Sequence, residues 1–471
     1  MTKQKLDGKR EPAAPRTERG AKAAAGRPLS GDATRERKHS QEEAMKHKTK
    51  ARSTLFTRNF TLLVLGQVSS LLGNYTLKFA LSMYVLERTG SASVFAGLLA
   101  AAMAPTILLS PVGGVLADRA DRRRIMVTLD ALSGLAVLAA AAAMQAADHI
   151  AVIAALLFVL SILGAFESPT VQACVPQMLS GGDLLKGNAV VGQVQAVAGL
   201  VTPFLGSVFY AAFGLGPVFA AAVICFFVTA GFECLLRLDP PERQVDGGKS
   251  AAAILRADLA ESLRFLRRDQ PAVCKLLLLA ALVSMVLVSL ASVGFPYLVR
   301  TVLGLSAQLY GAAESAMGVA AIAGSAAVGL LAGRLRPSRM HWLVAAAGLC
   351  LLPAGAAFLL PVGVMGRYLV LLAAFCGCQL AAGMFSICAV SLVQQRTPRH
   401  LTGKVMAFVY TIPLCAQPVG QLLCGALLDA FAGSVWLVLL PGGLLICAAG
   451  LASAKLFAGM ERDQPAKPQG T

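Results

Sequence analysis

Long apolar runs separated by short polar connections dominate the chain from about residue 60 onward. Each run holds roughly twenty residues, the length that a helix needs to cross ~30 Å of hydrocarbon. A backbone inside a membrane must satisfy its own hydrogen bonds, so these runs are expected to be helices. Twelve are predicted, over residues 60–86, 92–117, 125–146, 150–172, 188–213, 216–237, 273–299, 307–333, 341–360, 367–392, 404–429 and 434–456.

The composition agrees with an all-α membrane protein. Of the 471 residues, 56% are hydrophobic and 14% are charged, whereas soluble domains carry roughly 25% charge. The eleven cysteines lie mostly inside apolar runs, which argues against a secreted disulfide scaffold. Residues 1–57 hold few large apolar side chains and are predicted to form a disordered, basic cytoplasmic tail. No nucleic-acid partner is expected for this tail, because no aromatic residue is interleaved with the basic ones over residues 1–54.

Lysine and arginine gather on one side of the predicted spans. If the N-terminus and every even-numbered connection share a side, that side holds 38 of the 42 Lys and Arg residues. The opposite side holds Arg88, Arg300 and Arg367, and Lys78 lies inside the first span. The excess of positive charge in cytoplasmic loops predicts that both termini are cytoplasmic. A multi-pass protein of the plasma membrane is therefore expected, in particular of a bacterial inner membrane.

The chain repeats itself after about 215 residues. At this offset, the segment Gly114–Arg124 aligns with Gly329–Arg339, and each follows the second span of its half. Two parallel halves joined by a long loop are typical of a rocking transporter. The predicted division is a six-helix bundle over 58–237, a cytoplasmic linker with an amphipathic helix over 238–272, a second six-helix bundle over 273–456 and a cytoplasmic tail over 457–471.

The loop after the second span resembles the signature of the major facilitator superfamily, with Gly114, then Asp118-Arg119, then a basic cluster that includes Arg122 and Arg123. The stretches Leu65–Asn74 and Ser168–Ala173 resemble the branch that holds macrolide-type and siderophore exporters. The resemblance implies twelve transmembrane helices in two pseudo-symmetric bundles. It also implies that Gly114, Asp118, Arg119, Arg122 and Arg123 form a gating loop, although the arginines alone would also serve to fix the topology.

This sequence departs from the family pattern at several positions. Asp121 stands where the family has Gly, and Asn74 and Val171 stand where the exporter branch often has an acidic residue and Arg. The fifth span carries part of the antiporter signature, namely Gly199, Pro203 and Gly206. Export is therefore favoured, while the alternative is that Pro and Gly are simply frequent in membrane helices.

Polar side chains inside the spans are the candidates for a substrate cavity. Gln67, Ser70, Asn74 and Lys78 fall within about 80° of one another on a helix. Lys78 would attract an anionic group of a substrate, unless it snorkels to the surface. Gln195, Gln379, Tyr410 and Gln417 belong to polar stripes in the fifth, tenth and eleventh spans, for which interhelical hydrogen bonding is the alternative.

Acidic residues inside the spans are the candidates for proton coupling, since a charge there is costly and is usually functional. Glu167 and Glu314 are proposed for this role, and a Lys78–Glu314 pair would exchange protonation against substrate binding. The alternatives are that Glu314 is wet near the outer mouth and that Glu167 pairs with a cytoplasmic Arg. Asp130 and Glu233 are expected to pair with loop arginines, and Asp429 is expected to be wet.

The sequence thus favours a secondary active transporter that exports a small organic compound, drug-like, siderophore-like or a metabolite, in exchange for protons. Uptake or facilitated movement of a metabolite is the alternative, and a receptor or scaffold without transport is a remote one. The five His have no spaced partners and no phosphate loop is complete, so no enzyme, metal or cofactor is expected. The expected partners are the substrate, protons and lipid, with the protein as a monomer.

Overall fold

The computed structural model describes residues 55–145, 149–179, 182–238, 270–331, 336–398 and 401–462, together with Arg264 and Arg268. The predicted basic tail before Leu55, most of the linker with its amphipathic helix, and the tail beyond Arg462 lie outside the described residues.

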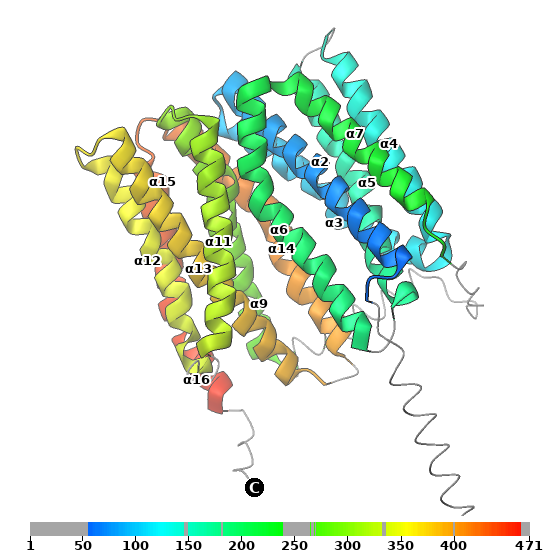
Figure 1. Ribbon diagram of the computed structural model, residues 1–471. Helices are drawn as coiled ribbons and strands as arrows, with labels where there is room; N and C mark the ends of the chain where they lie inside the picture. The colour runs from blue at the N-terminus through cyan, green and yellow to red at the C-terminus, as the bar shows by residue number, and fades with distance from the viewer. Residues whose placement is uncertain are drawn as a thin grey trace, which may run out of the picture. The chain divides into compact units, whose positions relative to one another are not determined.

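Twelve helices are long and apolar enough to cross a membrane, and they coincide with the twelve predicted runs (Figure 1). The described residues contain no strand. The prediction of an all-α membrane fold is therefore confirmed. The helices of the first half are α2 (Arg58–Thr89), α3 (Ala92–Arg119), α4 (Arg122–Ala143), α5 (His149–Met178), α6 (Gly182–Phe213) and α7 (Leu215–Cys234).

The second half contains the remaining spans. Its first span is a composite of α9 (Pro271–Val283), η2 (Ser284–Val288), η3 (Leu290–Gly294), α10 (Phe295–Tyr297) and η4 (Leu298–Val302). The others are α11 (Ala307–Leu331), η5 (Pro337–Arg339) with α12 (Met340–Leu359), α13 (Val364–Arg396), α14 (Thr402–Ala430), and α15 (Trp436–Ala452) with α16 (Ala454–Arg462).

The composite span differs from the single regular helix predicted over 273–299. Residues 284–288, 290–294 and 298–302 have π-helical hydrogen bonding. Pro296 lies within this stretch, and proline has no N–H to donate to the preceding turn. Local widening of the helix re-satisfies the freed backbone groups, and such turns often occur at functional sites.

Tight glycine turns join neighbouring spans at one end of the molecule. Gly90, Gly214 and Gly304 have positive φ values of 60°, 74° and 63°, a conformation that costs glycine little. Gly90 and Gly304 stand 214 positions apart, close to the repeat offset. We call the end with these turns the far end, and the end that carries the loop from Arg119 to Arg124 the basic end.

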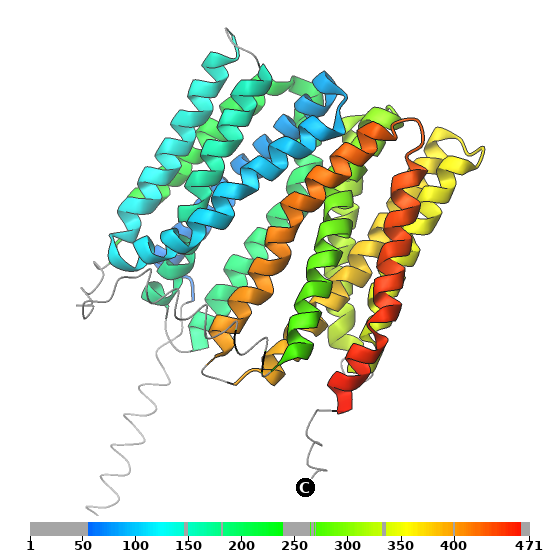
Figure 2. The same cartoon turned by 180° about the vertical axis from the view of Figure 1, so that it is seen from behind.

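The contacts between helices follow the same internal symmetry. Within the first half, α2 packs on α6 and α7, and α5 packs on α3 and α4. Within the second half, α12 packs on α13 and α15, and α13 packs on α11. The two halves meet where α3 packs on α14 and α6 packs on α11 (Figures 1 and 2). Each of these two pairs becomes the other when the halves are exchanged, as the sequence repeat predicts.

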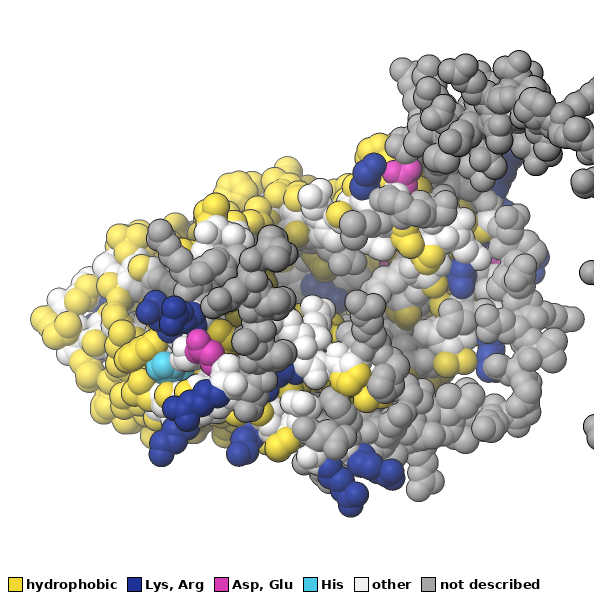
Figure 3. All heavy atoms as spheres, turned by 90° about the horizontal axis from the view of Figure 1, so that it is seen from below, with side chains coloured by type: hydrophobic (Ala, Val, Ile, Leu, Met, Phe, Trp, Pro, Cys, Tyr) yellow, Lys and Arg dark blue, Asp and Glu magenta, His cyan; other side chains and the backbone are white. Residues whose placement is uncertain are grey.

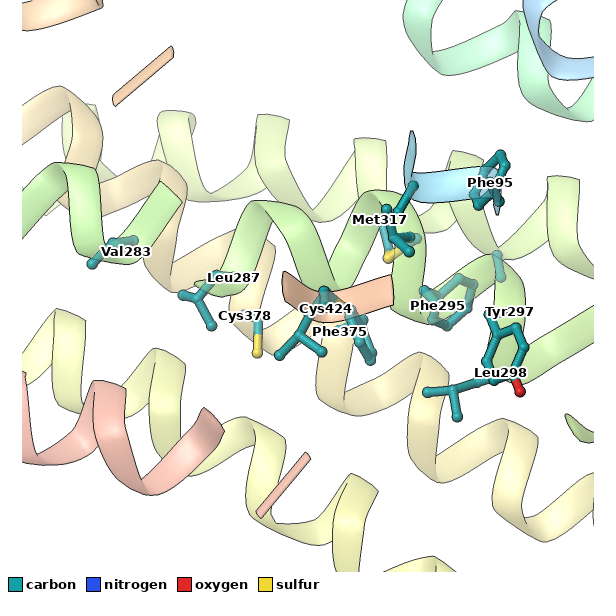
Figure 4. Packing of buried hydrophobic residues seen from close by; sticks show 14 of the residues in the cluster. Phe95, Val283, Leu287, Phe295, Tyr297, Leu298, Met317, Phe375, Cys378 and Cys424 are labelled. Carbon is teal, nitrogen blue, oxygen red and sulfur yellow. The ribbon is translucent and has the colours of Figure 1, made fainter. Parts of the chain in front are cut away.

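Glycines allow the halves to approach closely at both contacts. A Cβ at Gly311 of α11 would lie 2.5 Å from the Pro203 carbonyl oxygen of α6. A Cβ at Gly425 of α14 would lie 2.7 Å from the Ala92 carbonyl oxygen of α3. Small residues at such crossings bring helix backbones together in a membrane. One buried apolar cluster then continues from the first half into the second, with Phe95, Phe295 and Phe375 among its members (Figure 4).

Candidate functional site

A cavity of about 250 Å³ lies between the two halves. Its walls come from α2, α3 and α5 of the first half and from η3 and α14 of the second. The volume is near the lower limit of typical ligand pockets. The polar side chains in its wall are Lys78, Ser82, Thr106, Ser161, Ser292 and Gln421, and the apolar ones include Leu99, Met103, Ile107, Leu157 and Leu414.

Lys78 is exposed to this cavity. Its charge interacts electrostatically with that of Glu167 on α5. The Lys78–Glu314 pair that the sequence suggested is not formed. Within the described part of the chain, no ion pair or electrostatic interaction links these two side chains. The polar stripe on the first span therefore placed Lys78 at a cavity, but the acidic neighbour there is Glu167.

Glu314 lies instead at the contact between α6 and α11. Its carboxyl group is hydrogen-bonded to Tyr310, and Glu314 Oε2 has no partner among the described residues. The Tyr310 ring stacks on Phe79 of α2, with ring centroids 5.3 Å apart and planes inclined by 19°. One residue further on, Ser315 Oγ donates to the Leu200 carbonyl oxygen at 2.7 Å. Glu314 is thus next to contacts that join the two halves.

Gln421 and Ser292 are lining residues outside the set chosen from the sequence. Gln421 Nε2 donates to Ser292 Oγ at 3.2 Å, and Gln421 Oε1 has no partner among the described residues. Ser289 Oγ donates to the Gln417 carbonyl oxygen at 3.3 Å, so α14 is tied to the π-helical stretch. The polar stripe predicted on the eleventh span contains Gln417, about one helical turn before Gln421. It indicated the correct face of α14, but it did not show which residue reaches the cavity.

The other residues predicted to line the cavity are not among its walls. Gln67 is buried on α2, and Asn74 is half-buried with Oδ1 unpartnered within the described part of the chain. Gln379 and Gln417 are half-buried, while Gln195 and Tyr410 are exposed. Their proposed contact with substrate stays a prediction.

Two arginines of the predicted gating loop, Arg122 and Arg123, cap helix ends. Arg122 Nε donates to the Ala117 carbonyl oxygen at 2.7 Å, at the end of α3. Arg123 donates to the Cys234 carbonyl oxygen, at the end of α7. A cation that bonds the last carbonyls of a helix also interacts favourably with its dipole. Gly114 is half-buried and Arg119 is exposed, and the Asp118 side chain lies outside the described residues.

The partial antiporter signature lies on the helix that meets α11. Pro203 and Gly206 are buried, and Gly199 is exposed. The Pro203 carbonyl faces Gly311, and a Cβ at Gly206 would lie 3.5 Å from the Thr76 Cα atom. Pro203 and Gly206 therefore belong to the packing between helices, and their role in exchange stays a prediction.

Four polar side chains from four helices meet inside the first half. Ser70 Oγ of α2 lies 3.3 Å from Asp130 Oδ1 of α4 and 3.3 Å from Glu167 Oε1 of α5. Asp130 is also hydrogen-bonded to Glu233 of α7. The expectation that Asp130 and Glu233 pair with loop arginines was wrong, because these two carboxyl groups face each other. Sequence reasoning missed this cluster, since the rotation of each helix decides which side chains meet.

Charged groups also join the two halves at the far end. Asp429 at the end of α14 accepts from Ser91 Oγ at 2.6 Å, from Ala92 N at 2.7 Å and from Ser93 N at 2.9 Å. Asp429 is partly exposed, in agreement with the expectation that it is wet, but its carboxylate also caps the N-terminus of α3, which the sequence did not predict. Arg300 forms an ion pair with Glu87, which also accepts from Tyr210 at 2.8 Å.

Basic side chains mark the opposite end. Figure 3 views the molecule from below, and Lys and Arg side chains are prominent among the described residues on this face. Arg336 and Arg339 belong to this set, and both act electrostatically on Glu461 at the end of α16. The backbone N–H of Ser338 donates to Glu461 Oε2 at 3.1 Å. This distribution matches the asymmetry counted in the sequence.

Comparison with known proteins adds the family. The family model of the Major Facilitator Superfamily matches residues 63–412. Macrolide efflux protein A of Streptococcus pyogenes is 24% identical over 389 residues, which cover 82% of this chain and 92% of the relative. The multidrug efflux pump Tap of Mycobacterium tuberculosis is 28% identical over 390 residues, which cover 80% and 88%.

A solved structure shows the same fold. The crystal structure of peptide transporter POT in complex with sulfate superposes with a TM-score of 0.67, covering 86% of this chain and 96% of that chain at 14% identity. The resemblance seen in the loop signature is thereby confirmed, and the efflux relatives agree with the exporter branch. The family and these relatives are transporters, not enzymes. The chain belongs to the Major Facilitator Superfamily and is a multi-pass membrane transporter.

Proposed function

We propose that this transporter exports a small organic compound in exchange for protons, by alternating access of the cavity around Lys78. The observation that carries the proposal is the position of this cavity, whose walls come from both halves of the fold. Rocking of one half against the other would change which face the cavity reaches. The relatives named as efflux proteins support outward movement.

The proposed orientation places the basic end in the cytoplasm, as the distribution of Lys and Arg favours. The far end then faces outward. The contacts of Asp429 with the start of α3 and of Arg300 with Glu87 join the two halves there. These contacts would hold the outer side closed and must break when the cavity opens outward.

The lining indicates the class of substrate. Lys78 offers a positive charge, Gln421 and Ser292 offer hydrogen-bonding groups, and most of the remaining wall is apolar. Such a surface favours an amphipathic compound with an anionic or hydrogen-bonding group. Glu167 interacts with the charge of Lys78, so protonation of Glu167 would free Lys78 for the substrate. Glu314, next to the contact between the halves, is the second proposed coupling residue.

Flux into proteoliposomes tests the proposal. The protein would be reconstituted and offered erythromycin, ethidium and an amphipathic organic anion, each with and without an imposed pH gradient. Accumulation of at least one compound that requires the gradient is expected. Equal flux without a gradient would favour facilitated transport, and binding without any flux would favour a receptor.

A further inference from the structure

Two carboxyl groups share a dry site in the first half. Asp130 and Glu233 have exposed fractions of 0% and 1%, and the two groups are hydrogen-bonded to each other. Glu167 and Ser70 also act on Asp130, and Glu167, Cys174 and Cys234 interact with Glu233.

One oxygen of each carboxyl lacks a donor. Asp130 Oδ2 and Glu233 Oε2 are buried without a hydrogen-bond partner in the described part of the chain. Two ionised carboxyls in direct contact would repel each other strongly away from water. A proton between them removes the repulsion and supplies the missing donor, as in enzymes where two close carboxyls share one proton. The described residues contain no group of His, Cys, Asp and Glu that could hold a metal ion.

Ser70 connects this pair to the cavity. Its single hydroxyl hydrogen can be donated to only one carboxyl at a time, so the other carboxyl can hydrogen-bond to Ser70 Oγ only when it is protonated and donates. Its distances to Asp130 Oδ1 and Glu167 Oε1 are both 3.3 Å. Glu167 is half-buried and interacts with the charge of Lys78 in the cavity wall. Polar groups therefore continue from the cavity to the buried pair.

The basic end lies on the other side of the pair. Glu233 acts on Cys174 of α5, as do Arg122, the first residue of α4, and Asp121, which caps that helix. Arg123 donates to the carbonyl of Cys234, the residue that follows Glu233. A change in the charge of the pair is therefore positioned to act on the loop that the sequence singles out for gating.

We propose that Asp130 and Glu233 form a proton-binding site that Ser70 connects to Glu167. At rest the pair holds one proton. A second proton bound to Glu167 is passed to Ser70 Oγ as the hydroxyl hydrogen of Ser70 moves to Asp130 Oδ1, the carboxylate oxygen that Ser70 contacts. Ser70 ends unchanged, and one proton has moved from Glu167 to the pair. The use of this proton in transport rests on the proposed coupling, whereas its presence in the pair does not.

Infrared spectroscopy of the purified, reconstituted protein tests the site without any transport. The carbonyl stretching band of protonated carboxyl groups would be recorded at about pH 7, where exposed carboxyls are ionised. The variants are D130N, E233Q, the double variant and S70A, with D183N as a control from an acid outside the cluster. Correct folding of each variant would be checked by its helical circular dichroism and by elution as a single species.

The expected result is a protonated-carboxyl component that shifts in each single variant and disappears in the double variant. The control should keep this component unchanged. The S70A variant should keep this component too, but exchange of the carboxyl proton for deuterium should be at least severalfold slower than in the unmodified protein. If the double variant keeps every protonated-carboxyl component of the unmodified protein, the site is overturned, because Glu167 and Glu314 would then account for the whole band. The site is also overturned if the component lost in the double variant responds, in the unmodified protein, to replacement of sodium by choline at constant pH. Exchange as fast in S70A as in the unmodified protein would overturn the route through Ser70.

The two proposals can fail separately. If the protonated-carboxyl component is present but flux does not depend on a pH gradient, the proposed proton coupling is contradicted and the proton-binding site is not. If flux is driven by the pH gradient but the protonated-carboxyl component is missing, the proton-binding site is contradicted and the proposed proton coupling is not.

Discussion

At the scale of single residues, Lys78 has the most direct link to the cavity. It is exposed to this space and interacts with the charge of Glu167. A charged hydrogen bond contributes about 1.5–3 kcal/mol, so one cation can decide whether an anionic group is bound.

Replacement of the cation tests this role. Lys78→Ala is expected to lower the substrate-driven flux by about tenfold or more, since 1.4 kcal/mol corresponds to a factor of ten. Membrane insertion should be unchanged. Lys455→Ala is a matched control, because Lys455 is an exposed cation on α16. Normal flux in the Lys78 variant would remove this residue from the mechanism.

Sequence reasoning at this scale was partly successful. The stripe that contains Gln67, Asn74 and Lys78 predicted a cavity-facing cation, and the structure places Lys78 in the wall. It did not predict the Asp130–Glu233 pair, because two carboxyls on distant helices meet only once the helix rotations are fixed. The same reason made Glu314 a wrong choice of partner for Lys78.

At the scale of elements, the start of α3 is capped by a residue from the other half. Asp429 accepts two backbone N–H groups and the Ser91 hydroxyl. A carboxylate at a helix N-terminus satisfies unpaired donors and interacts favourably with the dipole. Because this cap joins two halves that are proposed to rock, it stabilises only the state in which the far end is closed.

Loss of this cap should shift the balance between states. Asp429→Asn removes the charge and one acceptor oxygen, at a cost of about 0.5–2 kcal/mol for a helix cap. The closed far end should become about 2- to 30-fold less favoured. Distances between spin labels across the far end, measured by double electron–electron resonance, would report the populations. An unchanged distribution would mean that the cap has no part in closure.

The close packing of α6 on α11 leads to a second prediction at this scale, which concerns flux when Gly311 is replaced by a larger residue. A Cβ at Gly311 would lie 2.5 Å from the Pro203 carbonyl oxygen, so Gly311→Val should prevent this contact and reduce flux at least tenfold. Gly164→Ala is the control, since a Cβ there meets no atom within 4 Å. Equal flux in the two variants would contradict a role for this contact.

The existence of the elements was easier to predict than their irregularities. Length and apolar character identified all twelve spans, because a membrane imposes both. The π-helical turns between Ser284 and Val302 were not predicted. Their hydrogen bonding depends on neighbours such as Gln417, whose carbonyl accepts from Ser289.

At the scale of the whole molecule, two contacts related by the sequence repeat join the halves. These are α3 with α14 and α6 with α11, and the cavity around Lys78 lies between the halves. Alternating access requires these contacts to open at one end of the molecule while they close at the other. The repeat at an offset of about 215 predicted this symmetry, but it did not predict which end is closed.

Distances along one inter-half pair of helices test this claim most directly. Spin labels on unnatural amino acids, which leave the eleven native cysteines in place, would be set at Ala212 and Gln308 for the far ends of α6 and α11. A second pair at Ala189 and Leu330 would report the basic ends. The account predicts that a pH change or erythromycin lengthens one distance while it shortens the other. Two distances that stay fixed under all conditions, or that lengthen together, would contradict alternating access.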